Sequence, residues 1–214
     1  MTDKNGRDTK GIIDIGTNSC RLFIAEVMKT EKGIDILNEL IKEVEIVKLG
    51  EGVNENHFLK EEAIERTIEC LKKYKETADK YNVKELKAFA TSATRDAENR
   101  EKFMKKVREL GIEIKCISGE EEAKLNFLGN SLVFNDRILV IDIGGGSTEF
   151  TLGKNNEIDF IKSIDIGAVR ATEKFFSQDD YSQENIEKCK EWVRKNIEEI
   201  KKIKNEEFKA VGVA

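Results

Sequence analysis

Two short segments of the chain combine acidic, hydroxyl and small residues at nearly the same spacing. The segment at 12–23 reads IIDIGTNSCRLF, and the segment at 140–150 reads VIDIGGGSTEF. Aligning Asp14 with Asp142 also aligns a glycine two residues later and a serine five residues later. A carboxylate beside a glycine-containing polar turn is suited to hold a divalent cation and a phosphate group. The chain therefore contains two copies of a candidate phosphate site.

The second copy has the more open turn. Its turn residues are Gly144, Gly145, Gly146 and Ser147. Glycines let backbone N–H groups approach an anion without side chains in the way, and the serine adds a hydroxyl donor. In the first copy, Asn18 and Ser19 supply polar groups at the same turn. Both turns could contact one ligand if the two copies face each other, whereas a tight hairpin without a ligand is the alternative.

Acidic side chains accompany both turns. Asp14 and Asp142 stand at strand ends beside the turns, where hard carboxylate oxygens can hold Mg²⁺ directly or through water. Glu149 lies two residues past the serine of the second turn, so it shares that face of the outgoing strand. The pattern predicts a magnesium site at these strand ends.

Two further segments each allow a structural and a chemical interpretation. In ISGEEEA, Ser118 and Glu121 have the spacing of a capping box, which competes with a catalytic role for the glutamate. In ATSATRDAENRE, Arg95 at a strand-to-helix turn could grip a phosphate with two N–H groups. Ser92 or Thr94 could instead cap the helix that follows.

Short apolar runs rich in β-branched residues predict the strands that carry these segments, and apolar residues at helical spacing predict the helices. In the first half, strands are expected at 11–16, 21–27, 34–50, 85–91 and 112–117, with helices at 59–81 and 97–110. In the second half, strands are expected at 137–144, 147–154, 157–167 and 208–214, with helices at 168–176 and 183–204. Each glycine turn then joins the first two strands of its half.

The repeat predicts an α/β chain with two related domains that start with equivalent hairpins. We expect the boundary within 123–136 and assign the domains to 1–125 and 126–214. The last strand stops without the turn and helix expected after it, so the second domain is expected to be the first part of a longer one.

Composition limits the function classes. Charged residues make up 37% of the chain and the net charge is −5, which argues against a broad nucleic-acid surface. The four cysteines show no C-x-x-C spacing and there is one histidine, so a zinc site or redox pair is not indicated. No apolar run approaches the ~20 residues of a membrane span, and the polar start lacks a secretion signal. We expect a cytoplasmic protein with no membrane partner.

Five motifs in this order closely resemble the exopolyphosphatase and guanosine pentaphosphate phosphohydrolase family. They are DIGTNSCRL, ATSATRDAENRE, ISGEEEAKLNFLG, DIGGGSTEF and SIDIGAVRATEKFF. The resemblance implies the actin-like ATPase superfamily fold, with two ribonuclease-H-like domains of mixed sheets flanked by helices and a cleft between them. It also implies Mg²⁺-dependent removal of terminal phosphate from inorganic polyphosphate or guanosine pentaphosphate.

The resemblance also assigns roles to residues of this chain. It places the catalytic glutamate, which would deprotonate the attacking water, at Glu121, with Glu122 as the other register. It assigns Asp142 and Glu149 to Mg²⁺ and to positioning of that water. The terminal phosphate would be bound by Asn18, Ser19, Arg95, Gly144, Gly145, Gly146 and Ser147.

Three other functions remain open from the sequence. A sugar or acid kinase of the same superfamily would use the turns for ATP, although ISGEEEA fits the phosphatase family better. A nucleotide-gated scaffold, or a phosphatase homologue that senses polyphosphate without turnover, would share the same motifs. A homodimer is possible, and the motifs do not choose between the two substrates.

Overall fold

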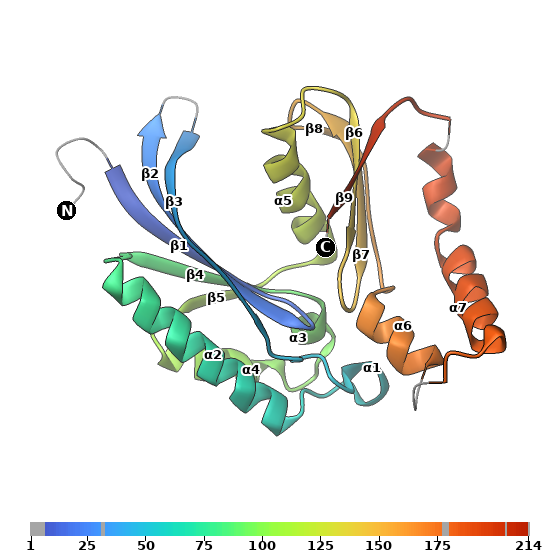
Figure 1. Ribbon diagram of the computed structural model, residues 1–214, viewed down its shortest axis with the longest axis horizontal. Coiled ribbons are helices and arrows are strands. Elements are labelled where there is room, and N and C mark those ends of the chain that lie inside the picture. Colours follow the sequence, from blue (N-terminus) through green and yellow to red (C-terminus); the bar gives the residue numbers. More distant parts are fainter. Residues whose placement is uncertain (1–6, 31–32, 177–179, 204, 214) are drawn as a thin grey trace. The chain divides into compact units, whose positions relative to one another are not determined.

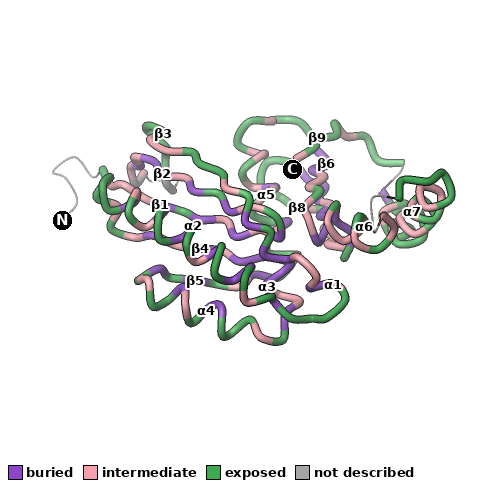
Figure 2. Tube along the Cα trace, turned by 60° about the horizontal axis from the view of Figure 1, so that its bottom comes forward, coloured by how far each residue is buried: buried purple, intermediate pink, exposed green. Residues whose placement is uncertain are grey.

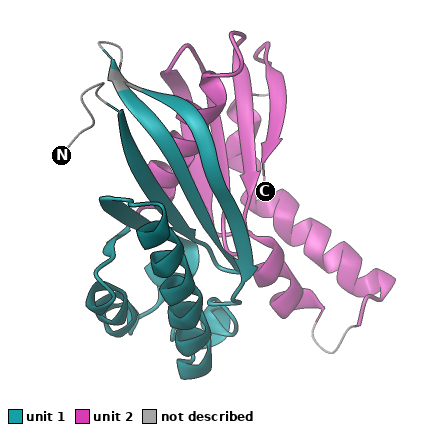
Figure 3. Ribbon diagram, turned by 60° about the vertical axis from the view of Figure 1, so that its left-hand side comes forward, with its two compact units in different colours: residues 1–116 teal, residues 117–214 magenta. Residues whose placement is uncertain are grey.

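A computed structural model describes residues 7–30, 33–176, 180–203 and 205–213. The chain divides into two compact units, Met1–Cys116 and Ile117–Ala214, which are coloured separately in Figure 3. Each unit is built on its own mixed sheet, and each is described by itself.

The first unit contains a five-stranded sheet in the order β3-β2-β1-β4-β5. Its strands are β1 (Arg7–Ile15), β2 (Ser19–Thr30), β3 (Gly33–Ile46), β4 (Glu85–Ala90) and β5 (Glu113–Cys116). The first three strands form an antiparallel meander, while β4 runs parallel to β1 and β5 runs parallel to β4. The end of β1, where Asp14 stands, is therefore surrounded by β2 and β4.

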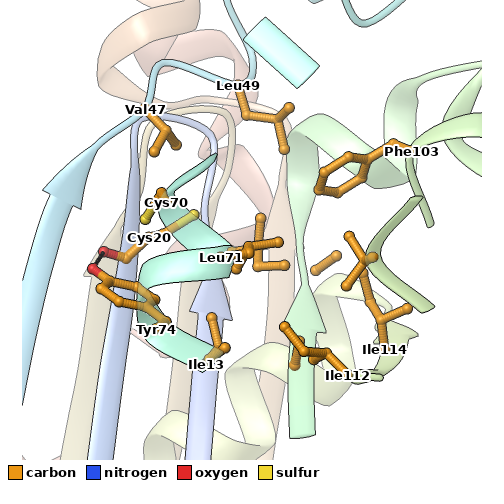
Figure 4. Close-up of a cluster of buried hydrophobic side chains, with 14 of the residues drawn as sticks. Ile13, Cys20, Val47, Leu49, Cys70, Leu71, Tyr74, Phe103, Ile112 and Ile114 are labelled. Atoms are coloured by element: carbon orange, nitrogen blue, oxygen red, sulfur yellow. Dashed lines mark hydrogen bonds between the residues drawn. The ribbon is translucent and has the colours of Figure 1, made fainter. Parts of the chain in front are cut away.

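The core of the first unit lies between this sheet and two helices, α2 (Glu61–Lys80) and α4 (Arg100–Glu109). Alternation along β1 directs Ile13 and Ile15 into that core, so Asp14 points to the opposite face of the sheet. Figure 4 shows these packed side chains, including the hydroxyl of Tyr74, which donates a 3.0 Å hydrogen bond to the carbonyl of Cys20. Helix α2 thus fixes the start of β2 directly after the first turn.

The second unit contains a four-stranded sheet in the order β8-β7-β6-β9. Its strands are β6 (Ile138–Ile143), β7 (Thr148–Lys154), β8 (Glu157–Ile164) and β9 (Lys209–Val213). Helix α5 (Gly119–Ser131) covers one face of this sheet (Figure 1). Phe127 of this helix packs on Ile138 and Val140. On the other face Leu139 packs with Ile203 of the 3₁₀ helix η2 (Glu198–Ile203).

Two more helices complete the second unit, α6 (Ala168–Phe175) and α7 (Gln183–Asn196), and they contact each other. Phe175 of α6 and Trp192 of α7 bring their rings to a centroid distance of 5.4 Å. Neither helix has a buried residue among those described, in contrast to the purple core segments of the first unit in Figure 2.

The predicted repeat is confirmed. In both units a first strand pairs antiparallel with the second and parallel with a later strand, as β1 does with β2 and β4, and as β6 does with β7 and β9. The α/β fold with two mixed sheets flanked by helices is therefore the predicted one. All predicted strands and helices have a counterpart, although residues 204 and 214, at the ends of two of them, lie outside the described residues.

The structure differs from the prediction in detail. The expected domain division at 125/126 falls inside α5, whereas the compact units divide between Cys116 and Ile117. The reason is that α5 packs on β6, β7 and β8, so the whole helix stays with the second sheet. The helix expected at 183–204 ends earlier, and η2 follows it. Two short helices, α1 (Val53–Asn56) and α3 (Ser92–Asp96), were not predicted.

Candidate functional site

The turn between β6 and β7 is closed by one backbone bond and supported from behind by α6. The N–H of Gly144 donates to the carbonyl of Ser147 at 2.9 Å. The first amides of α6 then donate to the turn: Ala168 to Gly144 at 2.9 Å and Val169 to Gly145 at 2.9 Å. The N-terminal N–H groups of α6 are therefore occupied by the turn itself, and they hold its carbonyl oxygens on one side.

Two residues near the start of α6 complete this support. Arg170 donates from Nε to the carbonyl of Gly146 at 2.8 Å. Gly167 packs so closely that a Cβ there would lie 2.3 Å from the Gly145 carbonyl oxygen and 2.5 Å from the Gly146 nitrogen. Only a glycine fits this position, because the obstacles are backbone atoms that cannot turn away.

The carbonyls and the amides of this turn therefore differ in their hydrogen bonding. Its three glycine carbonyls accept bonds from α6 residues, whereas the described residues include no backbone acceptor for the amides of Gly145, Gly146 and Ser147. Successive amides of this kind form the concave nest that binds phosphate oxygens. Ser147, the last residue of the turn, is 2% exposed.

Two carboxylates stand beside this turn. Asp142 and Glu149 are directly opposite each other in the antiparallel β6–β7 pair, which places their Cβ atoms about 4.5–5.5 Å apart. Both face the side of the sheet that α5 covers, because Val140 and Thr151, two residues away on each strand, contact that helix or its core. Glu149 is 2% exposed. The pair concentrates negative charge at the edge of this turn.

Each carboxylate accepts a hydrogen bond from a neutral side chain. Asn126 of α5 donates from Nδ2 to Oδ2 of Asp142, and Ser163 of β8 donates from Oγ to Oε1 of Glu149 at 2.7 Å. Ser163 is the direct cross-strand neighbour of Glu149 in β8. Sequence reasoning missed both donors. The position of Asn126 on the same helix as the ISGEEEA motif was the available signal, and Ser163 opens the quoted motif SIDIGAVR.

The first turn repeats the closing bond and differs in its support. The N–H of Gly16 donates to the carbonyl of Ser19 at 2.9 Å, as in the second turn. The carbonyls of Thr17 and Asn18 accept from the segment after β3: from Gly50 to Thr17 at 2.8 Å, and from Lys48 to Asn18 at 2.9 Å. Here the support comes from an extended segment, and Asn18 itself is exposed.

Arg95 lies in α3, next to the first turn. The N–H of Thr91, which precedes α3, donates to the carbonyl of Ile15 at 3.2 Å, so the helix starts where β1 ends. Ser92 and Thr94 lie inside α3, and the residue at the start of α4 is Asn99, so the expectation that one of them caps the next helix is wrong. The first unit thus brings Asp14, Asn18, Ser19 and Arg95 to one end of its sheet.

The capping-box interpretation of Ser118 and Glu121 is confirmed. The N–H of Glu121 donates to Ser118 Oγ at 3.1 Å, and the N–H of Ser118 donates to Glu121 Oε2 at 2.9 Å. The Glu121 carboxylate is therefore turned back toward the start of α5. Glu122 is one turn before Asn126 on the same helix, on the face that meets Asp142.

Cys20 follows the first turn and could be considered as a nucleophile. It is fully buried, and contact with the Cys70 thiol together with burial raises the pKa of Cys20. A thiol must be ionised to attack phosphorus, so burial of this kind favours an inert side chain. The described residues contain no group of three or more His, Cys, Asp or Glu that could hold a metal by themselves.

Comparison with known proteins assigns the chain to a family. The model of the Ppx/GppA phosphatase family matches residues 24–214. Exopolyphosphatase 2 of Mycobacterium tuberculosis is 35% identical over 196 residues, which cover 87% of this chain and 60% of that protein. The chain therefore belongs to the Ppx/GppA phosphatase family.

A bifunctional 3-dehydroquinate synthase/phosphatase of Fusobacterium nucleatum is 54% identical over 212 residues, which are 94% of this chain and 32% of that protein. Among solved structures, the family member of Aquifex aeolicus has a TM-score of 0.74 at 34% identity, with 97% of this chain and 66% of that chain covered. The chain thus spans about a third of one curated relative and 60% of the other. These matches agree with the actin-like ATPase fold expected from the motifs.

No helix among the described residues combines the length and apolar character that a membrane crossing requires.

Proposed function

We propose that the protein is a Mg²⁺-dependent hydrolase that removes the terminal phosphate of inorganic polyphosphate, of guanosine pentaphosphate, or of both, by attack of water. The family supports a phosphatase. The observation that carries the proposal is the acid pair Asp142 and Glu149 beside a turn in which three successive amides have no backbone acceptor among the described residues. A phosphate nest beside two carboxylates suits a phosphoryl group accompanied by a cation.

The residues present fit Mg²⁺. This ion usually keeps several waters and takes one or two protein carboxylates together with phosphate oxygens of the substrate. Asp142 and Glu149 supply such a pair, and like charges opposite each other in a sheet are destabilising unless something compensates them. When bound, Mg²⁺ would neutralise charge on the phosphoryl oxygens. Asp14 remains a proposed ligand with less support, because Arg21 stands directly opposite it.

The phosphate-binding role is proposed for the second turn first. The amides of Gly145, Gly146 and Ser147 would donate to the terminal phosphate, and Gly144 closes the turn that presents them. Asn18, Ser19 and Arg95 remain proposed phosphate ligands of the first unit, where they are grouped at one end of its sheet. An arginine there can bind a phosphate with two parallel N–H groups.

For the general base, the geometry favours Glu122 over Glu121. The Glu121 carboxylate accepts the N–H of Ser118 and so is engaged at the start of α5. Glu122 shares its helix face with Asn126, whose amide reaches Asp142, so its carboxylate can approach a water near the acid pair. The base would orient this water and accept its proton during attack on phosphorus. Asp142 and Glu149 would hold the cation and the water.

The relatives leave the substrate open. One is named an exopolyphosphatase, and the other is named as a phosphatase joined to a synthase. Both polyphosphate and guanosine pentaphosphate end in a phosphoric anhydride, so the same nest and acid pair would serve either substrate.

The test is release of inorganic phosphate from both substrates by the full-length protein, with and without Mg²⁺, beside the variants Glu122→Gln and Glu121→Gln. We expect Mg²⁺-dependent release that Glu122→Gln abolishes and that Glu121→Gln leaves nearly unchanged, because glutamine at this helix position also completes a capping box. No release from either substrate by the intact protein would reject the hydrolase. Loss of phosphate release in Glu121→Gln alone would assign the general base to Glu121.

A further inference from the structure

We propose that Asn126 and Ser163 are positioning residues that fix the Asp142–Glu149 pair from two sides in the orientation a divalent cation requires. The inference rests on the proposed function, and it assigns a role to two side chains outside the expected set of site residues. Neither would touch the substrate or the cation. Each would act through the carboxylate to which it donates.

Asn126 is held firmly enough to act as an anchor. Its helix, α5, is fixed to the sheet by the buried side chains of Ala123 and Phe127, and the hydroxyl of Thr151 donates to the Ala123 carbonyl at 3.3 Å. The position of the Asn126 side chain along β6 is thus set by the packing of the whole helix. Its Nδ2 donates to Oδ2 of Asp142, and this bond fixes the carboxylate relative to α5.

Ser163 holds the other acid from the opposite direction. It stands beside Glu149 in the antiparallel β7–β8 pair, and its hydroxyl donates to Oε1 at 2.7 Å. Glu149 is 2% exposed, and a buried carboxylate is costly unless it is hydrogen-bonded or paired with a positive charge. Because Ser163 is held in register beside Glu149, the pairing of the two strands fixes the direction of this hydrogen bond.

The chemistry of the two donors fits a cation site better than a structural ion pair. Lysine or arginine in either place would neutralise a carboxylate and compete with the metal. An amide and a hydroxyl each bind one oxygen and leave the combined charge of the pair unchanged. A fixed oxygen also sets the direction of the second oxygen on the same carboxylate. Partners of this kind orient metal ligands, and their loss typically costs about 10–100-fold in metal affinity or activity.

The experiment measures Mn²⁺ binding, as a spectroscopic substitute for Mg²⁺, to the full-length protein without substrate by electron paramagnetic resonance. The variants are Asn126→Leu, Asn126→Ala, Ser163→Ala and Ser163→Thr. The matched control is Thr151→Val, which removes a hydroxyl between the same helix and sheet and leaves the acid pair untouched. The same proteins are assayed for phosphate release over a range of Mg²⁺ concentrations, and their thermal unfolding is recorded.

We expect the Asn126 variants and Ser163→Ala to weaken Mn²⁺ binding about 10-fold and to raise the Mg²⁺ concentration for half-maximal activity by a similar factor. Ser163→Thr keeps the hydroxyl and should retain wild-type affinity. Thr151→Val should lower the unfolding temperature without changing Mn²⁺ affinity. If the Asn126→Leu variant does not fold, Asn126→Ala takes its place in the comparison.

Three results would overturn the proposals separately. A wild-type protein that neither binds Mn²⁺ nor releases phosphate rejects the proposed function itself. A wild-type protein that does both, beside Asn126 and Ser163→Ala variants of unchanged affinity, rejects the positioning role alone. Weakened Mn²⁺ binding in Thr151→Val, equal to that in Ser163→Ala, would also reject it, because the loss would then follow from packing.

Discussion

The two glycine turns of this chain share one closing hydrogen bond and differ in almost everything that surrounds it. Gly16 to Ser19 and Gly144 to Ser147 are both 2.9 Å. In the first unit, however, the aspartate of the turn is paired across strands with Arg21, whereas in the second unit the equivalent aspartate is paired with Glu149. A duplicated backbone frame thus carries an aspartate opposite an arginine in one copy and an aspartate opposite a glutamate in the other.

The difference extends to the faces of the two sheets. Asp142 faces the side that α5 covers, and that helix contributes Asn126. Asp14 faces away from the core that α2 and α4 form on the first sheet. The two units therefore share the backbone frame of the turn and differ in the side chains that surround its aspartate.

Replacing the two aspartates gives the largest expected contrast. Asp142→Asn removes half of the acid pair and should reduce phosphate release by more than the ~10–100-fold typical of an outer partner. Asp14→Asn should have a smaller effect, because the residue directly opposite Asp14 is Arg21 and not a second acid. The measurement is kcat and the Mg²⁺ dependence of phosphate release for both variants. Equal losses would contradict the distinction between the turns.

The glycines behind the turns give the next contrast. Gly167→Ala would place a Cβ 2.3 Å from the Gly145 carbonyl oxygen, so the second turn itself must move. Overpacking of this kind costs about 1–3 kcal/mol, and here it should also reduce activity, because it displaces the amides proposed to bind phosphate. Gly50→Ala meets Thr17 Cγ2 at 2.3 Å, which is a side chain and can be removed.

A second substitution separates these two cases. Thr17→Ser deletes the obstructing methyl group and should recover most of the stability lost in Gly50→Ala. No single side-chain deletion can relieve Gly167→Ala, because its obstacles are backbone atoms. Urea unfolding and phosphate release of the single and double variants provide the readout. Failure of Thr17→Ser to rescue would show that Ala93, 3.1 Å from the added carbon, is the real obstacle.

The contrast between the turns also explains which features could be predicted from the sequence. The strands, the repeat and the glycine turns follow from alternation, spacing and residue type, which are local properties. The supports of the turns are not local: Gly50 and Gly167 lie far from Thr17 and Gly145 in the chain, and their glycine character is needed only for close packing. The roles of Asn126 and Ser163 could not be predicted either, because an asparagine in a helix and a serine in a strand are common and their hydrogen-bond partners come from other elements. The division at Cys116 depends on packing of α5, which the sequence does not display.

One buried hydroxyl bonds at the residue after each turn, and removing each hydroxyl separates an effect on stability from an effect on activity. Tyr74 donates to the carbonyl of Cys20, the first residue after the first turn. Thr148, the equivalent of Cys20, donates from Oγ1 to the carbonyl of Ile166 at 2.5 Å, next to Gly167. Tyr74→Phe and Thr148→Val should each cost about 1–3 kcal/mol, because a buried acceptor loses its donor. Only Thr148→Val should also lower phosphate release, because the lost bond holds the segment that joins β8 to α6.

Urea unfolding and kcat of both variants check this prediction. The control is Thr67→Val, which removes a buried hydroxyl that donates to the Ala63 carbonyl within α2 and lies away from both turns. A loss of activity in Tyr74→Phe equal to that in Thr148→Val would mean that the two turns are equally sensitive to their supports.

The smallest expected effect concerns one surface ion pair at β4 of the first unit and one at β9 of the second unit. Glu85 of β4 accepts from Lys10 and lies next to Lys87, both at 2.7 Å, and these lysines lower the pKa of Glu85 to about 2. In the second unit, Lys209 of β9 pairs with Asp136 at 2.5 Å and lowers the pKa of that carboxyl. All these groups are at the surface, where ion pairs contribute little and are screened by salt.

The sign of the pH dependence follows from the lowered values. A carboxyl whose folded pKa lies below its unfolded pKa of about 4.3 for glutamate stabilises the fold above that pH. The contribution is lost as pH falls toward about 2, the folded pKa of Glu85. Glu85→Gln should therefore lower the urea midpoint slightly at pH 7, and the difference from wild type should vanish near pH 2. Asp136→Asn should behave alike, and 1 M salt should reduce both effects. A difference that persists at low pH or in high salt would assign the effect to packing. A difference in one variant only would mean that the two ion pairs contribute unequally.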